Sequence, residues 1–157
     1  MIALKRVTPE ERDVLWSVMQ KYFYEMSALY DLDMDDAGDY PYPWFDAYFS
    51  EPERIAYWIM DGGRRAGFAL INAHSCVDEP IDHAMAEFTV FPRHRGKGAA
   101  REAVRQILAA HPGRWEIKFN VKNEAATTLW SGVARPHAFR VAVLGDGELA
   151  YLFTVNE

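Results

Sequence analysis

Cysteine is nearly absent from this sequence, because the 157 residues contain only Cys76. A single cysteine cannot form an internal disulfide, and no segment has the composition of a signal peptide or a membrane-spanning helix. The spacings CxxC and HExxH are also missing, so we expect no metal site. These absences predict a cytoplasmic protein with no membrane partner.

An excess of positive charge is also missing, since the formal net charge is -6 and the pI is about 5.4. Proteins that bind nucleic acids generally carry a basic face, so we expect no nucleic-acid partner; such a partner would give salt-sensitive binding. The length fits one domain, and half of the residues are hydrophobic while a quarter are charged. We therefore expect a single globular domain over residues 1–157.

Hydrophobic periodicity and turn residues predict the order of the elements along the chain. Thr8 and Pro9 are typical of a helix start, with Glu11 placed to complete a capping box. Asp61-Gly62-Gly63 and Gly145-Asp146-Gly147 indicate hairpins. The predicted strands are 2–7, 54–60, 66–74, 84–91, 115–121, 139–144 and 149–155; the predicted helices are 9–29, 45–49, 98–110 and 124–130.

A short basic segment, "FPRHRGKGAARE", interrupts this acidic chain between a predicted strand and a predicted helix. Arg93, Arg95 and Lys97 surround Gly96 and Gly98. The first amides of a helix lack partners within the helix, and with the helix dipole they favour a bound anion such as phosphate. Glycines let the backbone approach such a ligand closely. The phosphate-binding patterns GxxxxGK[ST] and GxGxxG are both absent.

Residues 95–100, Arg-Gly-Lys-Gly-Ala-Ala, resemble the acetyl-coenzyme A loop of the GNAT superfamily of N-acetyltransferases, whose pattern is [QR]-x-x-G-x-[GA]. A register that starts at Arg93 also fits, but the first places Ala100 at the packed start of the helix. The preceding "VFP", the following amphipathic helix, the later "NVKNEAATTLW" and the order of elements over the whole chain are similar to the family as well. The alternative is a basic turn that only caps a helix.

The resemblance implies an α/β (α+β) fold with a mixed, mostly antiparallel sheet of about seven strands, flanked by helices and splayed at the central motif strand. It also implies acetyl-CoA as the acyl donor. Asn123 would contact the pantetheine arm or only cap its helix. The main chain of the motif strand would contact the same arm, and the loop amides would hold the pyrophosphate, with the Arg95 and Lys97 side chains adding charge. These residues are Phe88, Thr89, Val90, Arg95, Gly96, Lys97, Gly98, Ala99 and Ala100.

The chemistry of this family is direct attack of an amine on a thioester, so an ammonium acceptor must first lose a proton. Glu87 precedes the expected pantetheine contacts and is the best-placed general base. Alternatively, it is an exposed strand residue or binds the substrate ammonium.

The general acid is not evident from the sequence. Trp130 stands where the family often has a tyrosine, and an indole N–H has no usable acidity. Trp130 can also be a plain core residue. A thiol has a pKa near 8.5, so a thiolate can leave without a strong acid. Tyr151, Ser131 and the tyrosines of the segment 30–44 are possible substitutes.

The segment 30–44 combines aspartates with aromatic residues, and we expect it to form the acceptor wall. Carboxylates attract a cationic amine, and aromatic faces hold it by cation–π contact. The alternative is a solvated acidic loop. The expected wall residues are Tyr40, Tyr42 and Trp44, beside Asp31, Asp33, Asp35, Asp36 and Asp39.

The sequence thus predicts an enzyme that acetylates a primary amine of a small molecule or a peptide. The alternative function is a noncatalytic acyl-CoA-binding or regulatory module of the same fold. The sequence leaves open the identity of the amine, the acyl chain length and whether the chain forms a homodimer.

Overall fold

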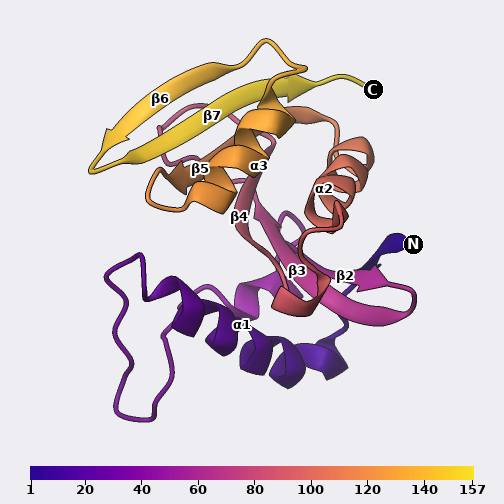
Figure 1. The fold of residues 1–157 in the computed structure, drawn as a ribbon, viewed down its shortest axis with the longest axis vertical. Coiled ribbons are helices and arrows are strands. Elements are labelled where there is room, and N and C mark those ends of the chain that lie inside the picture. Colours follow the sequence, from indigo (N-terminus) through magenta and orange to yellow (C-terminus); the bar gives the residue numbers. More distant parts are fainter.

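The computed structural model describes residues 1–157 and shows one open sheet with helices on both faces (Figure 1). The seven strands follow the order β1-β2-β3-β4-β5-β7-β6, and only β4 and β5 run parallel. This arrangement confirms the predicted fold class. The elements are β1 (Ile2–Arg6), α1 (Arg12–Met26), β2 (Ile55–Asp61), β3 (Arg64–Asn72), β4 (His83–Val90), α2 (Ala99–Ala110), β5 (Gly113–Asn120), α3 (Glu124–Ala134), β6 (Arg140–Gly145) and β7 (Glu148–Val155), with 3-10 turns at 9–11, 46–49 and 92–94.

The first helix is shorter than its hydrophobic pattern predicts. The Glu11 carboxylate accepts a hydrogen bond from the Thr8 amide at 3.1 Å, as expected of a capping box, but residues 9–11 form a 3-10 turn. At the other end α1 stops at Met26, where the Ser27 hydroxyl donates to the Tyr24 carbonyl at 2.6 Å. A serine side chain that bonds to the backbone competes with the helix and favours its end.

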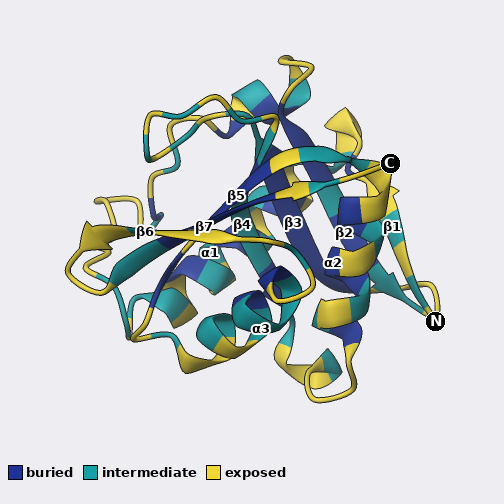
Figure 2. Ribbon diagram, turned by 90° about the horizontal axis from the view of Figure 1, so that it is seen from above, coloured by how far each residue is buried: buried dark blue, intermediate teal, exposed yellow.

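Two layers of apolar side chains cover the two faces of the sheet. One cluster joins α2 and α3 to β5 and β7 and includes the fully buried Trp115. The other joins α1 and the turn 46–49 to β2 and β3 around Trp58. Figure 2 shows the buried residues concentrated in the central strands, with much of the helices' outer surface exposed. None of the helices combines the length and hydrophobicity that crossing a bilayer would need.

The sheet splits between its two central strands. β4 and β5 pair only where 83–85 of β4 lie against 115–117 of β5. Leu70 of β3 lies opposite Glu87, and Ile71 lies opposite Met85, so Ala86 is an extra residue on β4. Such a bulge bends its strand away from a neighbour. Beyond it, β4 pairs only with β3 and β5 only with β7, which leaves a gap in the main-chain pairing at the centre of the sheet.

A buried carboxylate on β5 holds the long connection between β3 and β4. Glu116 is 1% exposed and accepts hydrogen bonds from the Ser75 hydroxyl at 2.6 Å and the Cys76 amide at 2.7 Å. The Ser75 hydroxyl oxygen in turn accepts from the amides of Val77 and Glu79. Glu116 thereby satisfies polar groups that would otherwise be buried without partners.

We predict that Glu116→Ala lowers the free energy of unfolding by about 2 kcal/mol or more, because the Ser75 hydroxyl and the Cys76 amide both lose their acceptor and the buried carboxylate leaves a cavity. Glu116→Gln keeps the size and one acceptor oxygen, so its loss should be clearly smaller. Urea denaturation of both variants measures the difference. Equal losses would show that the negative charge or the second acceptor oxygen, both absent from glutamine, carries the effect.

Candidate active site

The basic segment forms the connection from β4 to α2 as the sequence predicts. Residues 92–94 make a 3-10 turn, and the chain then passes through Gly96 and Gly98 with φ of +78° and +80°. This left-handed backbone favours glycine, because a side chain would meet the backbone there. Gly98 is the N-cap of α2. A carbon added to either glycine would touch no protein atom within 4 Å, so the space beside the loop is open.

Six consecutive amides in this loop have no hydrogen-bond acceptor in the protein: those of residues 96–101. The amide of Arg95 donates to the Pro92 carbonyl at 3.3 Å, and the amide of Glu102 starts the helical pattern by donating to Gly98. Unpaired amides at a helix N-terminus bind anions well. The loop therefore has the main-chain chemistry expected of a phosphate cradle.

The unpaired amides border a groove between α2 and α3 with a volume of about 460 Å³, which we call the donor groove. Arg101, on the first turn of α2, also lines it; the sequence interpretation had missed this residue. Neither Lys97 nor Arg101 forms an ion pair within the protein. The groove is lined by Val90, His94, Arg95, Gly96, Gly98, Ala99, Ala100, Arg101, Glu124, Ala125, Thr128 and Leu129.

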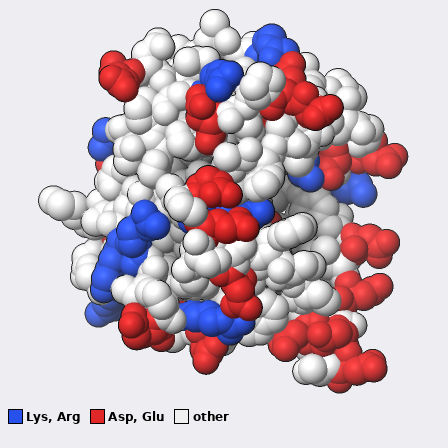
Figure 3. Space-filling view, turned by 180° about the vertical axis from the view of Figure 1, so that it is seen from behind, with Lys and Arg blue, Asp and Glu red and all other residues white.

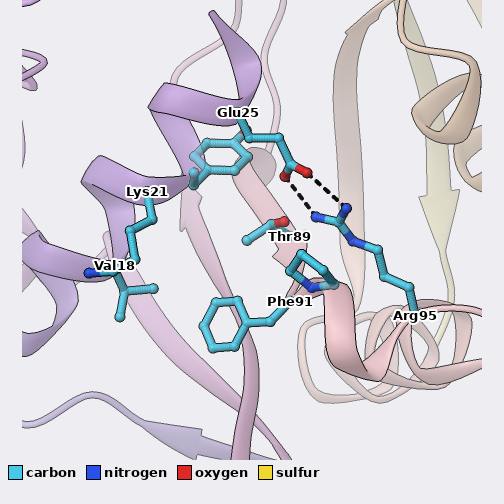
Figure 4. Close-up of a pocket in the computed structure, with 8 residues that line it drawn as sticks. Val18, Lys21, Glu25, Thr89, Phe91 and Arg95 are labelled. Carbon is cyan, nitrogen blue, oxygen red and sulfur yellow. Dashed lines mark hydrogen bonds and ion pairs between the residues drawn. The ribbon is translucent and has the colours of Figure 1, made fainter. Parts of the chain in front are cut away.

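The Arg95 side chain extends toward Glu25 of α1, as Figure 4 shows. Its two terminal nitrogens donate to the carboxylate of Glu25 at 2.7 and 2.9 Å, and its Nε donates to the Val90 carbonyl at 2.7 Å. The Arg95 guanidinium lowers the pKa of Glu25. The side chain expected to complement the pyrophosphate is thus engaged with Glu25 and Val90.

A second cavity, of about 470 Å³, lies near α1 and the segment 30–44, which we call the acidic loop. We call this cavity the Glu87 cavity. Glu87 and Ala86 of β4 line it beside Lys118 and Asn120 of β5, so it opens at the split in the sheet. The remaining lining residues are Tyr22, Phe23, Met26, Tyr30, Leu32, Asp33, Tyr40, Pro41, Tyr42, Phe119 and Glu148.

Two tyrosines hold the Glu87 carboxylate. The Tyr22 hydroxyl donates to Oε1 at 3.1 Å, and the Tyr42 hydroxyl donates to Oε2 at 3.3 Å. Burial raises the pKa of Glu87 from 4.5 to about 7, against the opposing effects of the two tyrosines and of the positive charge of Lys118. A carboxyl with a pKa near neutrality can both take up and release a proton at physiological pH.

The acidic loop contributes only some of the residues expected at the acceptor wall. Tyr42 and Asp33 line the Glu87 cavity; Tyr40 lines it as well, although it is largely buried and its backbone is bound by Gln20. Trp44 lies outside the cavity and is 61% exposed, with the Arg54 guanidinium 5.5 Å from its ring.

Most of the loop's aspartates face solvent and form an acidic corner of the surface (Figure 3). Asp35 accepts hydrogen bonds from the amides of Ala37 and Asp39 at 2.9 Å, so it shapes the loop itself. The alternative of a solvated acidic loop therefore describes a large part of this segment.

Of the residues considered as substitutes for the family's tyrosine, Tyr30, Tyr40 and Tyr42 line the cavity, whereas Tyr151 and Ser131 do not. Trp130 is buried and packs edge to face on Phe88, with ring centroids 5.4 Å apart, so it is a core residue. The hydroxyls of Tyr151 and Ser131 are 3.0 Å apart and bond to each other. Neither Tyr151 nor Ser131 lines the Glu87 cavity.

The remaining predicted contacts lie along the split or at its edge. Phe88, Thr89 and Val90 form the part of β4 that β5 does not pair with, and Val90 lines the donor groove. Asn123 caps α3, because its Oδ1 accepts from the Ala126 amide at 3.0 Å, and its Nδ2 lies 3.9 Å from the Met26 sulfur. Capping is therefore an observed role of Asn123, and contact with a ligand stays a prediction.

Comparison with known proteins gives the family of this chain. The profile of the Acetyltransferase (GNAT) family matches residues 20–131. The chain belongs to this family. A search of curated proteins found no match.

Solved acetyltransferases share the fold at low sequence identity. A GNAT acetyltransferase from Streptococcus agalactiae aligns with a TM-score of 0.73 at 15% identity, covering 99% of this chain and 96% of that one. The ribosomal-protein-S18-alanine N-acetyltransferase from Escherichia coli aligns with a TM-score of 0.65 at 13% identity, covering 100% and 96%. NAA60 from Arabidopsis thaliana, solved with acetyl-CoA, aligns with a TM-score of 0.59 at 11% identity, covering 98% and 97%.

We predict that the raised pKa of Glu87 makes the protein less stable as pH rises. Between pH 4.5 and about 7 the folded state keeps a proton on Glu87 that the unfolded state has lost, so the free energy of unfolding falls across this window. A rise from 4.5 to about 7 corresponds to roughly 3 kcal/mol once the pH is above 7. Denaturation of the wild type and of Glu87→Gln should therefore show the variant gaining relative stability from pH 4.5 to 7. A constant difference across that range would contradict the shift.

Proposed function

We propose that the protein is an N-acetyltransferase that moves the acetyl group of acetyl-CoA to a primary amine of a small molecule or a peptide. The observation that carries this proposal is the split between β4 and β5. It has a loop of six unpaired amides on one side and the Glu87 carboxyl on the other. A donor and an acceptor can meet there without either having to cross the packed core.

The donor side has the chemistry that a coenzyme A pyrophosphate requires. The amides of residues 96–101 and the side chains of Lys97 and Arg101 supply hydrogen bonds and positive charge without giving up any partner in the protein. The unpaired edge of Phe88, Thr89 and Val90 offers main-chain groups to an extended arm, as in strand addition. The related fold of NAA60 was solved with acetyl-CoA, which supports acetyl-CoA as the donor.

The acceptor side favours a cationic amine. Three carboxylates, those of Asp33, Glu87 and Glu148, line the Glu87 cavity together with several tyrosine rings and one lysine. This excess of negative charge attracts an ammonium group, and the aromatic faces can pack on its carbon chain. Trp44 lies outside the cavity, so we leave it out of the proposed acceptor site.

In the reaction, the ammonium first transfers a proton to the Glu87 carboxylate, directly or through a water molecule. The neutral amine nitrogen then attacks the thioester carbon; the C–N bond forms, the C–S bond breaks, and the thiolate of coenzyme A leaves while the nitrogen loses its second proton to water. Glu87 suits the first step because its pKa is raised to about 7 and its orientation is fixed by Tyr22 and Tyr42. A noncatalytic acyl-CoA-binding module needs no such carboxyl, so this environment favours an enzyme.

Binding of the donor is tested with two glycines in matched backbone conformations. Gly98 and Gly63 have φ of +80° and +81°, and a carbon added to either meets no protein atom. Alanine at both sites should therefore cost similar stability, on the order of 1–2 kcal/mol. Only Gly98→Ala places a methyl group beside the unpaired amides, so it should weaken coenzyme A binding tenfold or more in calorimetry. If Gly63→Ala weakens binding as much, the loop is not the specific site.

Catalysis is tested with Glu87→Gln, which keeps the size and removes the basicity. The acetylation rate over an amine panel should fall about a hundredfold at neutral pH, within the usual range for a general base. It should partly recover as pH approaches the pKa of the amine, because the acceptor then binds already neutral. An unchanged pH profile would remove Glu87 as the base. Binding of coenzyme A without turnover of any amine by the wild type would favour the noncatalytic module.

A further inference from the structure

The departing thiolate lacks a partner in the proposed reaction, and the inference below rests on that proposal. Trp130 cannot supply an acidic proton and is packed in the core against Phe88. Tyr151 shares its hydroxyl with Ser131 and does not line the cavity. The partner must therefore be sought among the side chains that border the Glu87 cavity.

The tyrosines of the cavity are poorly suited to this task. The Tyr22 and Tyr42 hydroxyls already donate hydrogen bonds to the Glu87 carboxylate. Burial is the main cause that raises the pKa of Tyr22, Tyr42 and Tyr30. A raised pKa makes a phenol a weaker acid than it is in water, so these groups part with a proton less readily than an ordinary tyrosine.

Lys118 is the one cationic side chain that lines this cavity. It lies on β5 immediately after Ile117, the last residue of β5 that pairs with β4, and so at the start of the split. Its ammonium makes no hydrogen bond or ion pair within the protein, whereas Arg114, earlier on the same strand, is paired with the Asp82 carboxylate. An unpaired, exposed cation at the start of the split is free to bind an anion that forms there.

We propose that Lys118 is the group that receives the coenzyme A thiolate. When the C–S bond breaks, the electron pair stays on sulfur, and the ammonium of Lys118 neutralises this charge and donates the proton that restores the thiol. Glu87 holds the proton taken from the acceptor amine, and its transfer to Lys118 through solvent returns both groups to their starting states. The attacking nitrogen loses its second proton to water as the amide forms, so the reaction of an ammonium acceptor with acetyl-CoA yields the amide, the thiol and one released proton.

Lys118 and Glu87 lie on different strands at the split, and this position gives the two residues separate roles. Glu87 comes from β4 and Lys118 from β5, so the base and the cation approach the split from its two sides. In water an ammonium and a phenol have similar acidity, with pKa values near 10.4 and 10. A lysine can therefore replace the tyrosine expected on α3, and it adds a full positive charge. The other titratable groups around it are Glu87 on β4, Glu116 on β5, Glu148 on β7, Cys76 before β4, and Asp33 and Tyr30 of the acidic loop.

The test measures the pKa of the coenzyme A thiol in its complex with the protein, by the ultraviolet absorbance of the thiolate across pH. S-methyl coenzyme A, which cannot ionise at sulfur, provides the baseline. In the wild-type complex the thiol pKa should lie below its ordinary value of about 8.5, because an opposite charge within a few ångströms lowers a pKa by one or more. In Lys118→Met the thiol should bind its proton tenfold or more tightly than in the wild-type complex, so its pKa should be higher. Lys118→Arg should restore most of the lowering of the thiol pKa.

Lys122→Met is the matched control, because this lysine lies on the same segment just beyond β5 and does not line the cavity. It should leave the thiol pKa unchanged. An equal thiol pKa in the wild type and Lys118→Met would overturn the inference, as would a shift caused instead by Tyr30→Phe. Calorimetry with coenzyme A separates this failure from that of the proposed function: if the wild type does not bind coenzyme A, the function itself is wrong.

Discussion

The split between β4 and β5 is the constraint on which the rest of the structure depends. A main-chain edge inside a protein leaves donors and acceptors without partners, which is costly unless something completes them. Here the extra residue at Ala86 lies where the pairing of β4 with β5 ends, and separate layers of side chains cover the two faces of the sheet. The Phe88 ring on Trp130 is part of the layer under α3. We call this gap between β4 and β5 the slot; it leaves one edge of β4 beyond Ala86 without a strand partner.

The same slot explains why Glu87 differs from the other carboxylates. Glu11, on the surface, meets a backbone amide and the Arg65 guanidinium, and these lower its pKa to about 2. Glu87 meets two neutral phenols instead, and burial outweighs their hydrogen bonds, so its pKa moves in the opposite direction. The surroundings supplied by the fold therefore decide the role of a glutamate side chain. Beside a cation at the surface it is a permanent anion, and beside phenols in a cavity it can carry a proton.

The sequence predicts those features that depend on neighbours along the chain. The loop, its two glycines and the helix behind them follow from local rules, and all seven strands lie within a few residues of their expected bounds. Features that join distant segments were missed. The Tyr22 hydroxyl reaches Glu87 across 65 residues, whereas its helical spacing indicated only a core side chain. Trp44 is the opposite case. The aromatic composition of the segment 30–44 predicted it at the acceptor wall, but the path of the loop places it outside the Glu87 cavity.

The pairing of Arg95 with Glu25 has a mechanical consequence. Residue 95 begins the loop that offers its amides to the donor, and residue 25 lies on the helix that borders the Glu87 cavity, 70 positions earlier in the chain. Two charge-assisted hydrogen bonds of this geometry resist both stretching and rotation. A shift of α1 on contact with an acceptor must either break this pair or carry the loop along. The pair thus joins the donor loop to the helix beside the Glu87 cavity, and because its two side chains are 44% and 42% exposed, breaking it costs about 1 kcal/mol or less.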